Sequence, residues 1–505
     1  MSHTSRLVRR FHEVVSAHGG RICASDSGGN LSFRDLDKGA RRLASGLSRT
    51  FGGSSRIALL APASREWVQG YWGVTLSGNP IVPLVEIHPA AEHARALAAA
   101  RVEGLLVSAE LRGRADEALA ALGRTHPALV LPRVLELEPL LASAAADTDV
   151  LPEVSGNAPA VLFFTSGTTG EPKGAVVTHD QLAALAEMVA AAWSVAPSDR
   201  LVHSLPLHHT HGLSVAFLVC FLSGASQYFL RRFASEPVWQ AFGGSTMFMG
   251  VPTMHKRLLD AFDEQPAAVR AVWREGARSL RLITSGSAAL PESVALRWHA
   301  LVDQIPLERF GMTEVGVALS NPLHGERRVG SCGQVLPGMQ VRIVDETGRD
   351  VAVGEPGEIW IRGPSVFAGY DADVRATEAM YCDGWLKSGD TATWLEGGYV
   401  KILGRTSVDI IKSGGYKLSA LEIEEALRRH SMVDEVAVVG IPDSDWGETA
   451  VAAIVAKGPI DTESLREFLK QELAPYKIPR RFVQVEELPK NALGKVTKHT
   501  LRTRL

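Results

Sequence analysis

Residues 165–174 have the sequence T-S-G-T-T-G-E-P-K-G, in which hydroxyls and glycines precede a single lysine, Lys173. Glycines let backbone N–H groups come close to anionic oxygens, hydroxyls are further donors, and a lysine supplies positive charge. We therefore predict that this segment binds the phosphates of a nucleotide. The expected phosphate-binding residues are Thr165, Ser166, Gly167, Thr168, Thr169, Gly170 and Lys173.

The residues on either side of this segment indicate a strand, a loop and a helix. An apolar run at 161–164 precedes it, as expected of a buried strand, and residues 178–190 have the composition of a helix. No Ser or Thr follows Lys173, so the segment differs from the phosphate loop G-x-x-x-x-G-K-[ST], in which that hydroxyl contacts magnesium. The structural alternative is a polar turn between two elements.

Four further motifs follow along the chain. They are F-G-M-T-E at 310–314, W-L-K-S-G-D at 385–390, G-R at 404–405 and P-K-N-A-L-G-K at 489–495. Together with the phosphate-binding segment, this ordered set resembles the adenylate-forming superfamily, which includes acyl-CoA synthetases, beetle luciferases and the adenylation domains of peptide synthetases. The resemblance implies an enzyme that converts a carboxylic acid to an acyl-adenylate with ATP and then transfers the acyl group to the thiol of CoA.

The composition agrees with a multidomain globular enzyme. The chain has 505 residues, of which 22% are charged and 46% hydrophobic. Lys plus Arg, 53 residues, nearly balance Asp plus Glu, 56 residues, and the net charge of −3 predicts no nucleic-acid partner. The sequence contains no run of about eighteen apolar residues, so it predicts no membrane span.

The cysteines and the amino terminus bear on the compartment. Cys23, Cys220, Cys332 and Cys382 form no C-x-x-C pair, so they predict neither a zinc site nor a disulfide framework and suit a reducing cytoplasm. Residues 1–20 lack the apolar core of a secretory signal. Their arginines are compatible with an organelle transit segment, but we predict an ordinary first helix and a cytoplasmic location. The sequence does not predict the oligomeric state.

The pattern of elements predicts an α/β fold in a large amino-terminal domain and a small carboxy-terminal one. Helical and strand-like segments alternate to about residue 330, which favours layered α/β sheets with largely parallel strands, and short alternating strands at 331–404 predict a β-rich subdomain. Residues 405–505 suffice for a small α+β domain. The resemblance implies that 1–404 is the adenylate-forming domain and that 405–505 is a mobile lid, with a hinge near 405–409.

The same resemblance assigns roles around the nucleotide. Glu314 is expected to hold Mg²⁺, a hard cation that prefers carboxylate and phosphate oxygens. Phe310 is expected to stack on adenine, Asp390 and Arg405 to contact the ribose, and Lys495 to bridge the carboxylate and the α-phosphate. Taken singly, each charged residue is equally explained as a solvated surface group. Gly311, Met312, Thr313 and Ser287 complete the expected ATP site, and Lys173, His209, Glu314 and Lys495 are the expected catalytic residues.

A second glycine-containing motif is expected to face the CoA thiol. The sequence S-G-G-Y at Ser413, Gly414, Gly415 and Tyr416 matches the superfamily segment that lines the pantetheine passage. Its two glycines permit close backbone approach. The alternative is a plain turn before a helix.

Two arginines suggest which acid is activated. By the resemblance, Arg257 and Arg309 line the acyl pocket, where an unpaired buried cation carries a desolvation penalty of several kcal/mol. A second carboxylate on the substrate would pair with them, and arginine suits its bidentate capture. We therefore predict a short dicarboxylate, and the motifs from residue 250 to 495 most resemble those of malonyl-CoA synthetases, which implies that Ser287 also binds the distal carboxylate. The alternative for Arg257 is that it caps its helix.

Three histidines in P-L-H-H-T-H-G at 206–212 belong to the same pocket by the resemblance. His209 is expected to be a gate and His211 to lie beside the acid. A metal site is the alternative, although no carboxylate or cysteine stands at ligand spacing. Methylmalonate is an alternative to malonate, since one methyl group changes binding by only about 1–3 kcal/mol. The sequence is also compatible with activation of a different acid for a carrier protein or a biosynthetic pathway, and with a nucleotide-binding regulator without turnover.

Overall fold

Two sheets with mainly parallel central strands carry described residues of the predicted motifs at 165–174 and 310–314. The computed structural model describes residues 4–142, 151–165, 173–413, 416–443, 446–490 and 496–505. In a seven-stranded sheet the strand order is β18-β8-β7-β4-β3-β5-β6. Its central strands are parallel, and β7 and β8 form an antiparallel hairpin at one side. The strands are β3 (Ile57–Leu60), β4 (Ile81–Pro83), β5 (Gly104–Val107), β6 (Arg133–Glu136), β7 (Pro159–Thr165), β8 (Lys173–Thr178) and β18 (Gly369–Tyr370).

The hairpin corrects the predicted order of strand, loop and helix. Residues 173–178 form strand β8, which pairs with β7 so that Lys173 lies opposite Thr165, and helix α7 (His179–Ala192) begins only afterwards. The sequence K-G-A-V-V-T explains this, because its β-branched residues favour a paired strand. Thr178 and Gln181 then cap α7 reciprocally, the side chain of each accepting from the backbone N–H of the other.

A nine-stranded sheet leads into Ser287 and into the F-G-M-T-E motif. Its order is β15-β14-β13-β12-β11-β9-β10-β1-β2, and β11, β12 and β13 are parallel neighbours whose carboxyl ends meet at one edge. That edge leads into Gly286 and Ser287 after β12 and into residues 311–314 after β13. The strands are β1 (Ile22–Asp26), β2 (Gly29–Ser32), β9 (Arg200–His203), β10 (Ser226–Phe229), β11 (Met247–Gly250), β12 (Leu282–Ser285), β13 (Leu307–Phe310), β14 (Leu319–Ser320) and β15 (Gln334–Val335).

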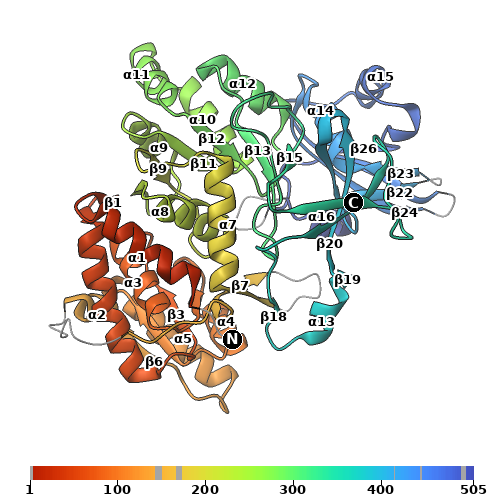
Figure 1. Ribbon diagram of the computed structural model, residues 1–505. Helices are drawn as coiled ribbons and strands as arrows, with labels where there is room; N and C mark the ends of the chain where they lie inside the picture. The colour runs from red at the N-terminus through yellow and green to blue at the C-terminus, as the bar shows by residue number, and fades with distance from the viewer. Residues whose placement is uncertain (1–3, 143–150, 166–172, 414–415, 444–445, 491–495) are drawn as a thin grey trace.

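Two antiparallel sheets complete the described fold. The first contains β16 (Gln340–Val344), β17 (Pro356–Arg362), β19 (Tyr381–Cys382), β20 (Trp385–Leu395) and β21 (Tyr399–Arg405). The second contains β22 (Ile410–Ser413), β23 (Tyr416–Ser419), β24 (Val433–Asp443), β25 (Gly447–Ala456) and β26 (Arg481–Gln484). Figure 1 shows this last sheet, in blue, on the side away from the amino-terminal helices. The fold class is therefore the predicted one, a larger part of layered α/β sheets with a β-rich sheet, followed by a smaller α+β part.

Several helices form where apolar residues recur at helical spacing behind a capping side chain. Ser32 caps α2 (Phe33–Phe51), which buries one face, and Asp461 caps α15 (Thr462–Glu472). None of the described helices is long and apolar enough to cross a membrane. Other helices used below or seen in Figure 1 are α1 (Arg6–His18), α3 (Arg65–Leu76), α4 (Ala90–Ala99), α5 (Arg112–Thr125), α6 (Leu137–Ala142), α9 (Ser235–Phe242), α10 (Pro252–Asp263), α11 (Ala267–Arg278), α12 (Glu292–Val302), α13 (Val374–Ala379), α14 (Ala420–Arg428) and α16 (Lys498–Arg504).

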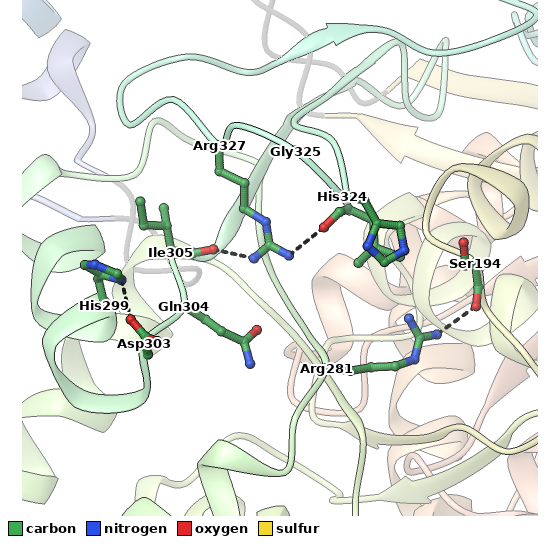
Figure 2. Close-up of a pocket in the computed structure, with 10 residues that line it drawn as sticks. Ser194, Arg281, His299, Asp303, Gln304, Ile305, His324, Gly325 and Arg327 are labelled. Carbon is green, nitrogen blue, oxygen red and sulfur yellow. Dashed lines mark hydrogen bonds and ion pairs between the residues drawn. The ribbon is translucent and has the colours of Figure 1, made fainter.

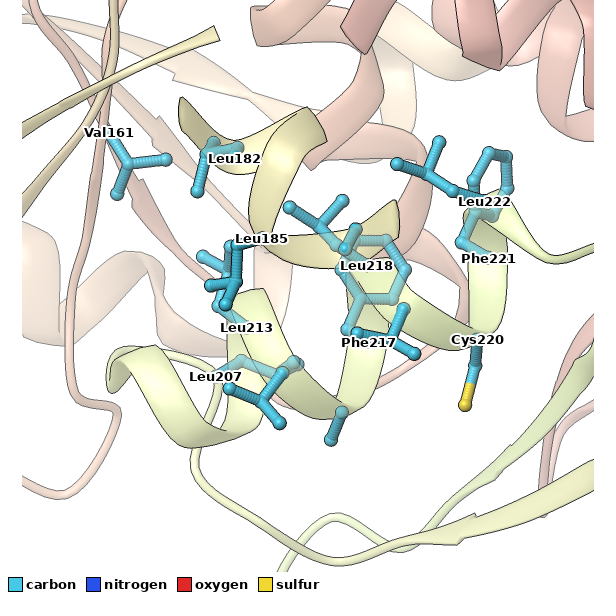
Figure 3. Close-up of a cluster of buried hydrophobic side chains, with 14 of the residues drawn as sticks. Val161, Leu182, Leu185, Leu207, Leu213, Phe217, Leu218, Cys220, Phe221 and Leu222 are labelled. Carbon is cyan, nitrogen blue, oxygen red and sulfur yellow. The ribbon is translucent and has the colours of Figure 1, made fainter. Parts of the chain in front are cut away.

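The main core lies where α7 packs against a π-helix, His211–Leu218, and the short α8 (Val219–Leu222) that continues it. Leu182 and Leu185 of α7 meet Phe217 and Leu218, all of them buried (Figure 3). A π-helix is rare and commonly marks a functional site, because its wider turn redirects side chains. Here it begins at His211, one of the predicted substrate-binding residues. The packed core thus fixes the position of that histidine.

Candidate functional site

The phosphate side of the site is built by the hairpin and by β18. Lys173 begins β8, its Nζ lies 3.7 Å from Oδ2 of Asp373, and it stands 5.5 Å from the centre of the Tyr370 ring. The other expected phosphate-binding residues, 166–172, lie outside the described residues, and Thr165 is described only as the end of β7. The structure therefore places Lys173 beside an aromatic ring and a carboxylate that the sequence motifs do not reveal.

Glu314 lies on the same side and is buried, with 6% of its surface exposed. Oε1 accepts a hydrogen bond of 2.6 Å from the Tyr370 hydroxyl. Glu314 lies in a turn at whose ends the backbones of Gly311 and Gly316 come close together. A Cβ on Gly311 would lie 1.8 Å from the Gly316 carbonyl oxygen, so this approach requires glycine at 311. One buried carboxylate is the protein ligand typical of an Mg²⁺ ion held mainly by phosphate oxygens, so Glu314 fits the metal that the resemblance implies.

The expected ribose pair is formed by neighbouring strands. Asp390 of β20 lies opposite Arg405 of β21, and Arg405 Nε is 3.1 Å from Asp390 Oδ1. Burial raises the pKa of Asp390 to about 6, and Arg405 opposes this shift. From the sequence, a tight S-G turn is expected before Asp390. Instead β20 continues through Gly389 at φ +72°, as a bulge opposite β17, because glycine adopts the left-handed region without strain.

Phe310 and the turn that follows it connect Glu314 to the nine-stranded sheet. Phe310 ends β13, is partly buried and accepts a backbone hydrogen bond from Ala318 at 3.0 Å. Met312 accepts from Val315 N at 3.1 Å, which closes the turn that contains Thr313. The F-G-M-T-E motif is thus a strand end followed by a turn that delivers Glu314.

The acyl side contains a buried arginine to which the described part of the chain offers no partner. Arg309 of β13 is 4% exposed, and neither Nε nor Nη2 has a hydrogen-bond partner among the described residues. Burial lowers its pKa to about 10, so the guanidinium still carries its charge at neutral pH. It lies against Gly286, where a Cβ would come within 2.4 Å of Arg309 Nε. Glycine at 286 is therefore required for the arginine to occupy this place.

The adjacent Glu308 does not neutralise that charge. Successive residues of a strand point to opposite faces, and Glu308 instead accepts a hydrogen bond from the Leu290 backbone at 3.3 Å. Burial raises the pKa of Glu308 to about 8, so the carboxyl is largely protonated at pH 7. Arg309 is consequently a buried positive charge that the described protein leaves without a counter-ion.

Ser287 and His211 lie together next to this arginine. Ser287 follows Gly286 in the left-handed region at φ +69°, and its Oγ is 3.4 Å from His211 Nδ1. His209 lies beside His208, with ring centres 4.0 Å apart, and burial lowers the pKa of His208. Across the part of the chain that the structure describes, no three His, Cys, Asp or Glu side chains converge on a point suited to a metal ion.

Arg257 stands apart from that group. Its guanidinium is exposed and lies over the Phe233 ring, 5.0 Å from the ring centre. It occupies the middle of α10 rather than either end, so it does not cap its own helix. Its neighbour Lys256 is paired with Asp260 at 2.8 Å. Within the described residues no hydrogen bond or ion pair joins Arg257 to Arg309 or Ser287.

The expected CoA and lid residues are only partly described. Ser413 and Tyr416 pair across β22 and β23, and the exposed Tyr416 ring stacks on Tyr476 with centres 4.4 Å apart. Gly414, Gly415 and Lys495 lie outside the described residues. Near the predicted hinge, Asp409 accepts a hydrogen bond from Arg405 N at 3.0 Å and forms an ion pair with the partly buried Lys498 at 2.6 Å.

A cavity of about 660 Å³ lies elsewhere, at the edge where β12 and β13 begin (Figure 2). Its two arginines are already engaged. Arg281 pairs with Asp199, and Arg327 donates to the carbonyl oxygens of Ile305 at 2.6 Å and Leu323 at 3.3 Å. This cavity therefore contains none of the expected site residues, and Ser287 and residues 309–314 lie at the opposite, carboxyl ends of the same strands.

Comparisons with known proteins agree with this geometry. Residues 11–371 match the family model described as AMP-binding enzyme, and residues 422–495 match the AMP-binding enzyme C-terminal domain. The mitochondrial malonate–CoA ligase of Mus musculus is 38% identical over 100% of this chain and 92% of its own length. The sulfoacetate–CoA ligase of Cupriavidus necator is 33% identical over 94% of this chain and 92% of its own length.

Among solved structures, ATP-bound MatB from Rhodopseudomonas palustris superposes with a TM-score of 0.89 and 30% identity, covering 99% of both chains. The order of motifs, the two sheets that carry them and these matches lead to one assignment. The chain belongs to the AMP-binding enzyme family.

Proposed function

We propose that this protein is an AMP-forming acid–CoA ligase whose acid is malonate. The observation that carries the proposal is Arg309, a buried guanidinium without a counter-ion among the described residues, on the strand that leads into Glu314. An unpaired buried charge is costly, and a second carboxylate on the substrate removes that cost by pairing with it. A malonate–CoA ligase with 38% identity along the chain supports the same substrate.

The reaction needs two transfers. In the first, a carboxylate oxygen of malonate attacks the α-phosphorus of ATP, and pyrophosphate leaves. In the second, the CoA thiol loses its proton and attacks the acyl carbon, so that AMP leaves and the thioester remains. The charge that develops at phosphorus must be met by positioned cations and donors, which is the role we assign to Lys173 and to Lys495.

We assign the remaining nucleotide contacts to the residues that the resemblance implies. Mg²⁺, held by Glu314, would neutralise phosphate charge when bound. Asp390, fixed by Arg405, would accept hydrogen bonds from the ribose hydroxyls, and Phe310 would stack on the adenine. The turn at 311–313, the segment at 165–170 and Ser287 would line the rest of the ATP site.

The distal carboxylate of malonate would be bound by three groups. Arg309 supplies the charge, Ser287 supplies a hydroxyl at a left-handed turn, and His211 lies within 3.4 Å of that hydroxyl. We assign Arg257 a weaker role, since it is exposed and stacks on Phe233. His209 would gate the entry of the acid.

The proposal extends to the lid. We propose domain limits of 1–404 and 405–505, with a β-rich subdomain at 331–404 and a hinge at 405–409, where Asp409 links Arg405 to Lys498. The segment 413–416 would then face the CoA thiol after the lid rotates. A cytoplasmic location remains a prediction from the cysteines, and one relative is mitochondrial.

A screen of ATP–pyrophosphate exchange tests the substrate. Malonate, methylmalonate, sulfoacetate, succinate, acetate, benzoate and octanoate are compared at equal concentration, and the product is analysed with and without CoA. We expect malonate to give the fastest exchange and CoA to convert the adenylate to malonyl-CoA and AMP. Exchange dominated by acetate or octanoate with malonate inert contradicts the proposed acid, and exchange without thioester formation contradicts CoA as the acceptor.

Sulfoacetate is included because it also has a second anionic group and is the acid in the name of one relative. If exchange is fastest with sulfoacetate, the proposed role of Arg309 stands, and sulfoacetate takes the place of malonate as the proposed acid.

A further inference from the structure

Residues 370–373 lie directly against the phosphate-binding hairpin. Tyr370, at the end of β18, pairs with Ala175 of β8, and the backbone N–H of Asp371 donates to the Gly174 carbonyl at 2.7 Å. The segment therefore continues the sheet beside the strand that begins with Lys173. Its next acidic residue, Asp373, reaches Lys173 at 3.7 Å.

Tyr370 contacts both charges that we assign to the magnesium–triphosphate site. Its hydroxyl donates to Glu314 Oε1 at 2.6 Å, and its ring lies 5.5 Å from Lys173 Nζ, a distance at which an ammonium is attracted to an aromatic face. Burial and the nearby Glu314 charge raise the pKa of the Tyr370 phenol, so the hydroxyl keeps its proton at neutral pH. One side chain thus links the cation and the carboxylate.

The backbone around Tyr370 is held from two directions. Asp371 forms a bidentate ion pair with Arg56, whose Nη1 and Nη2 lie 2.8 and 2.7 Å from the two carboxylate oxygens. Arg56 immediately precedes β3 of the central sheet. On the other side, Tyr370 N donates to Oγ1 of Thr377 in α13 at 2.8 Å. The ring is therefore fixed by the sheet and by a helix rather than by its own contacts alone.

We propose that Tyr370 is a positioning residue for the magnesium–ATP complex, whose hydroxyl orients the Glu314 carboxylate while its ring holds the Lys173 ammonium. The inference rests on the roles proposed above for Glu314 and Lys173. Groups that hydrogen-bond a metal-binding carboxylate commonly change metal affinity by about 10–100-fold when removed. The effect of losing the Tyr370 hydroxyl should therefore appear in metal binding and not in the affinity for the acid.

Tyr370→Phe removes the hydroxyl and keeps the ring. Mn²⁺, which accepts the same carboxylate and phosphate ligands as Mg²⁺ and is visible by electron paramagnetic resonance, is titrated into enzyme with α,β-methylene-ATP. We expect the Kd for Mn²⁺ to rise about tenfold, and the KM for malonate to stay within about twofold of wild type. An unchanged Kd for Mn²⁺ would overturn the inference.

Tyr381→Phe is the matched control, because the Tyr381 hydroxyl donates to the Phe367 carbonyl at 3.4 Å and not to Glu314. It should leave the Kd for Mn²⁺ within about twofold of wild type. Tyr370→Leu removes the ring as well, and the affinity for α,β-methylene-ATP should fall a further few-fold because Lys173 loses its aromatic neighbour. Equal nucleotide affinity for the Phe and Leu variants would contradict the role of the ring. Thermal unfolding of each variant verifies that it is folded.

The Mn²⁺ titration separates this inference from the proposed function. If wild type forms no thioester from malonate but Tyr370→Phe still weakens Mn²⁺ binding, the acid is wrong and the role of Tyr370 stands. If wild type makes malonyl-CoA and the variant binds Mn²⁺ normally, the inference about Tyr370 alone fails.

Discussion

The nucleotide side and the acyl side of the site treat charge in opposite ways. On the nucleotide side, Asp390 is paired with Arg405, and Glu314 accepts a hydrogen bond from Tyr370. On the acyl side, Arg309 is buried and has neither an ion pair nor a hydrogen bond among the described residues. On the first side the carboxylates of Asp390 and Glu314 already have protein partners, whereas on the second side Arg309 lacks an anion among the described residues.

This difference indicates which side of the site selects the acid. Groups that protein partners already hold in place are preorganised for the ATP that we propose binds on the nucleotide side. A buried charge without a partner instead favours any ligand that brings the missing charge and disfavours one that does not. The contrast between the two sides can be tested by substitution.

The largest effect is expected from Glu314→Gln on the nucleotide side. The change keeps the shape and removes the charge, so pyrophosphate release with malonate should fall roughly 10²–10³-fold at saturating Mg²⁺. Glu326→Gln is the control, since that carboxylate is 64% exposed and pairs with Arg328. A loss of less than about threefold for Glu314→Gln would show that this carboxylate does not support adenylation.

Arg309→Met should stabilise the protein in the absence of substrate. The lowered pKa of Arg309 means that the folded state disfavours the charged form of this side chain. The penalty is fully present below about pH 10, the pKa in the folded protein, and disappears as the pH rises above the pKa of the arginine in the unfolded chain. Relief of the penalty should raise the free energy of unfolding by about 1–3 kcal/mol at pH 7.

The measurement is thermal unfolding monitored by circular dichroism. Arg257→Met is the control, and because that side chain is exposed its stability should change by less than about 0.5 kcal/mol. A lower melting temperature for Arg309→Met would mean that the guanidinium has a stabilising protein partner.

Asp390 predicts the pH dependence of ATP use. Its pKa of about 6 means that the carboxyl group is mostly protonated at pH 5 and mostly ionised at pH 7, and protonation turns one of its two oxygens from an acceptor for the ribose hydroxyls into a donor. The value of kcat/KM for magnesium–ATP should therefore rise about tenfold between pH 5 and 7. Asp390→Asn should be slower at pH 7 and should lose this rise; an unchanged profile would assign it to another group.

The smallest effect is expected from Arg257→Ala on the acyl side. An exposed guanidinium is worth at most about 1 kcal/mol to an ion pair in water, so the KM for malonate should rise only a few-fold. Steady-state kinetics at saturating ATP measures it, with Lys256→Ala as the neighbouring control. A loss as large as that of Arg309→Met would mean that Arg257 turns inward when the acid binds.

Much of the fold follows from local pattern. The sequence predicts a helix at 462–472, which are the bounds of α15. It also predicts a helix at 33–49 and strands at 341–345 and 357–363, which differ from α2, β16 and β17 by only one or two residues at an end, because their apolar pattern is contained in the segment itself. Strand β8 was missed because its short K-G-A-V-V-T run becomes a strand only through pairing with β7. Tertiary pairing of this kind is not visible in a single segment.

The site divides in the same way. Lys173, Glu314 and Asp390 stand in motifs that the sequence displays, but their neighbours do not. Tyr370 and the bond between Arg56 and Asp371 join residues up to 315 positions apart, so only the folded chain brings them together. The signal in the sequence was slight, a single tyrosine within the stretch A-G-Y-D-A-D that precedes α13.

The most direct test of the missing anion compares malonate with acetate on wild type and on Arg309→Met. ATP–pyrophosphate exchange is measured for both acids at limiting concentration, so that the ratio of rates reports kcat/KM. We expect wild type to prefer malonate by about 100-fold, and the variant to lose about 10²-fold with malonate while keeping its rate with acetate, because only malonate brings a second carboxylate. Equal losses with the two acids would contradict the account.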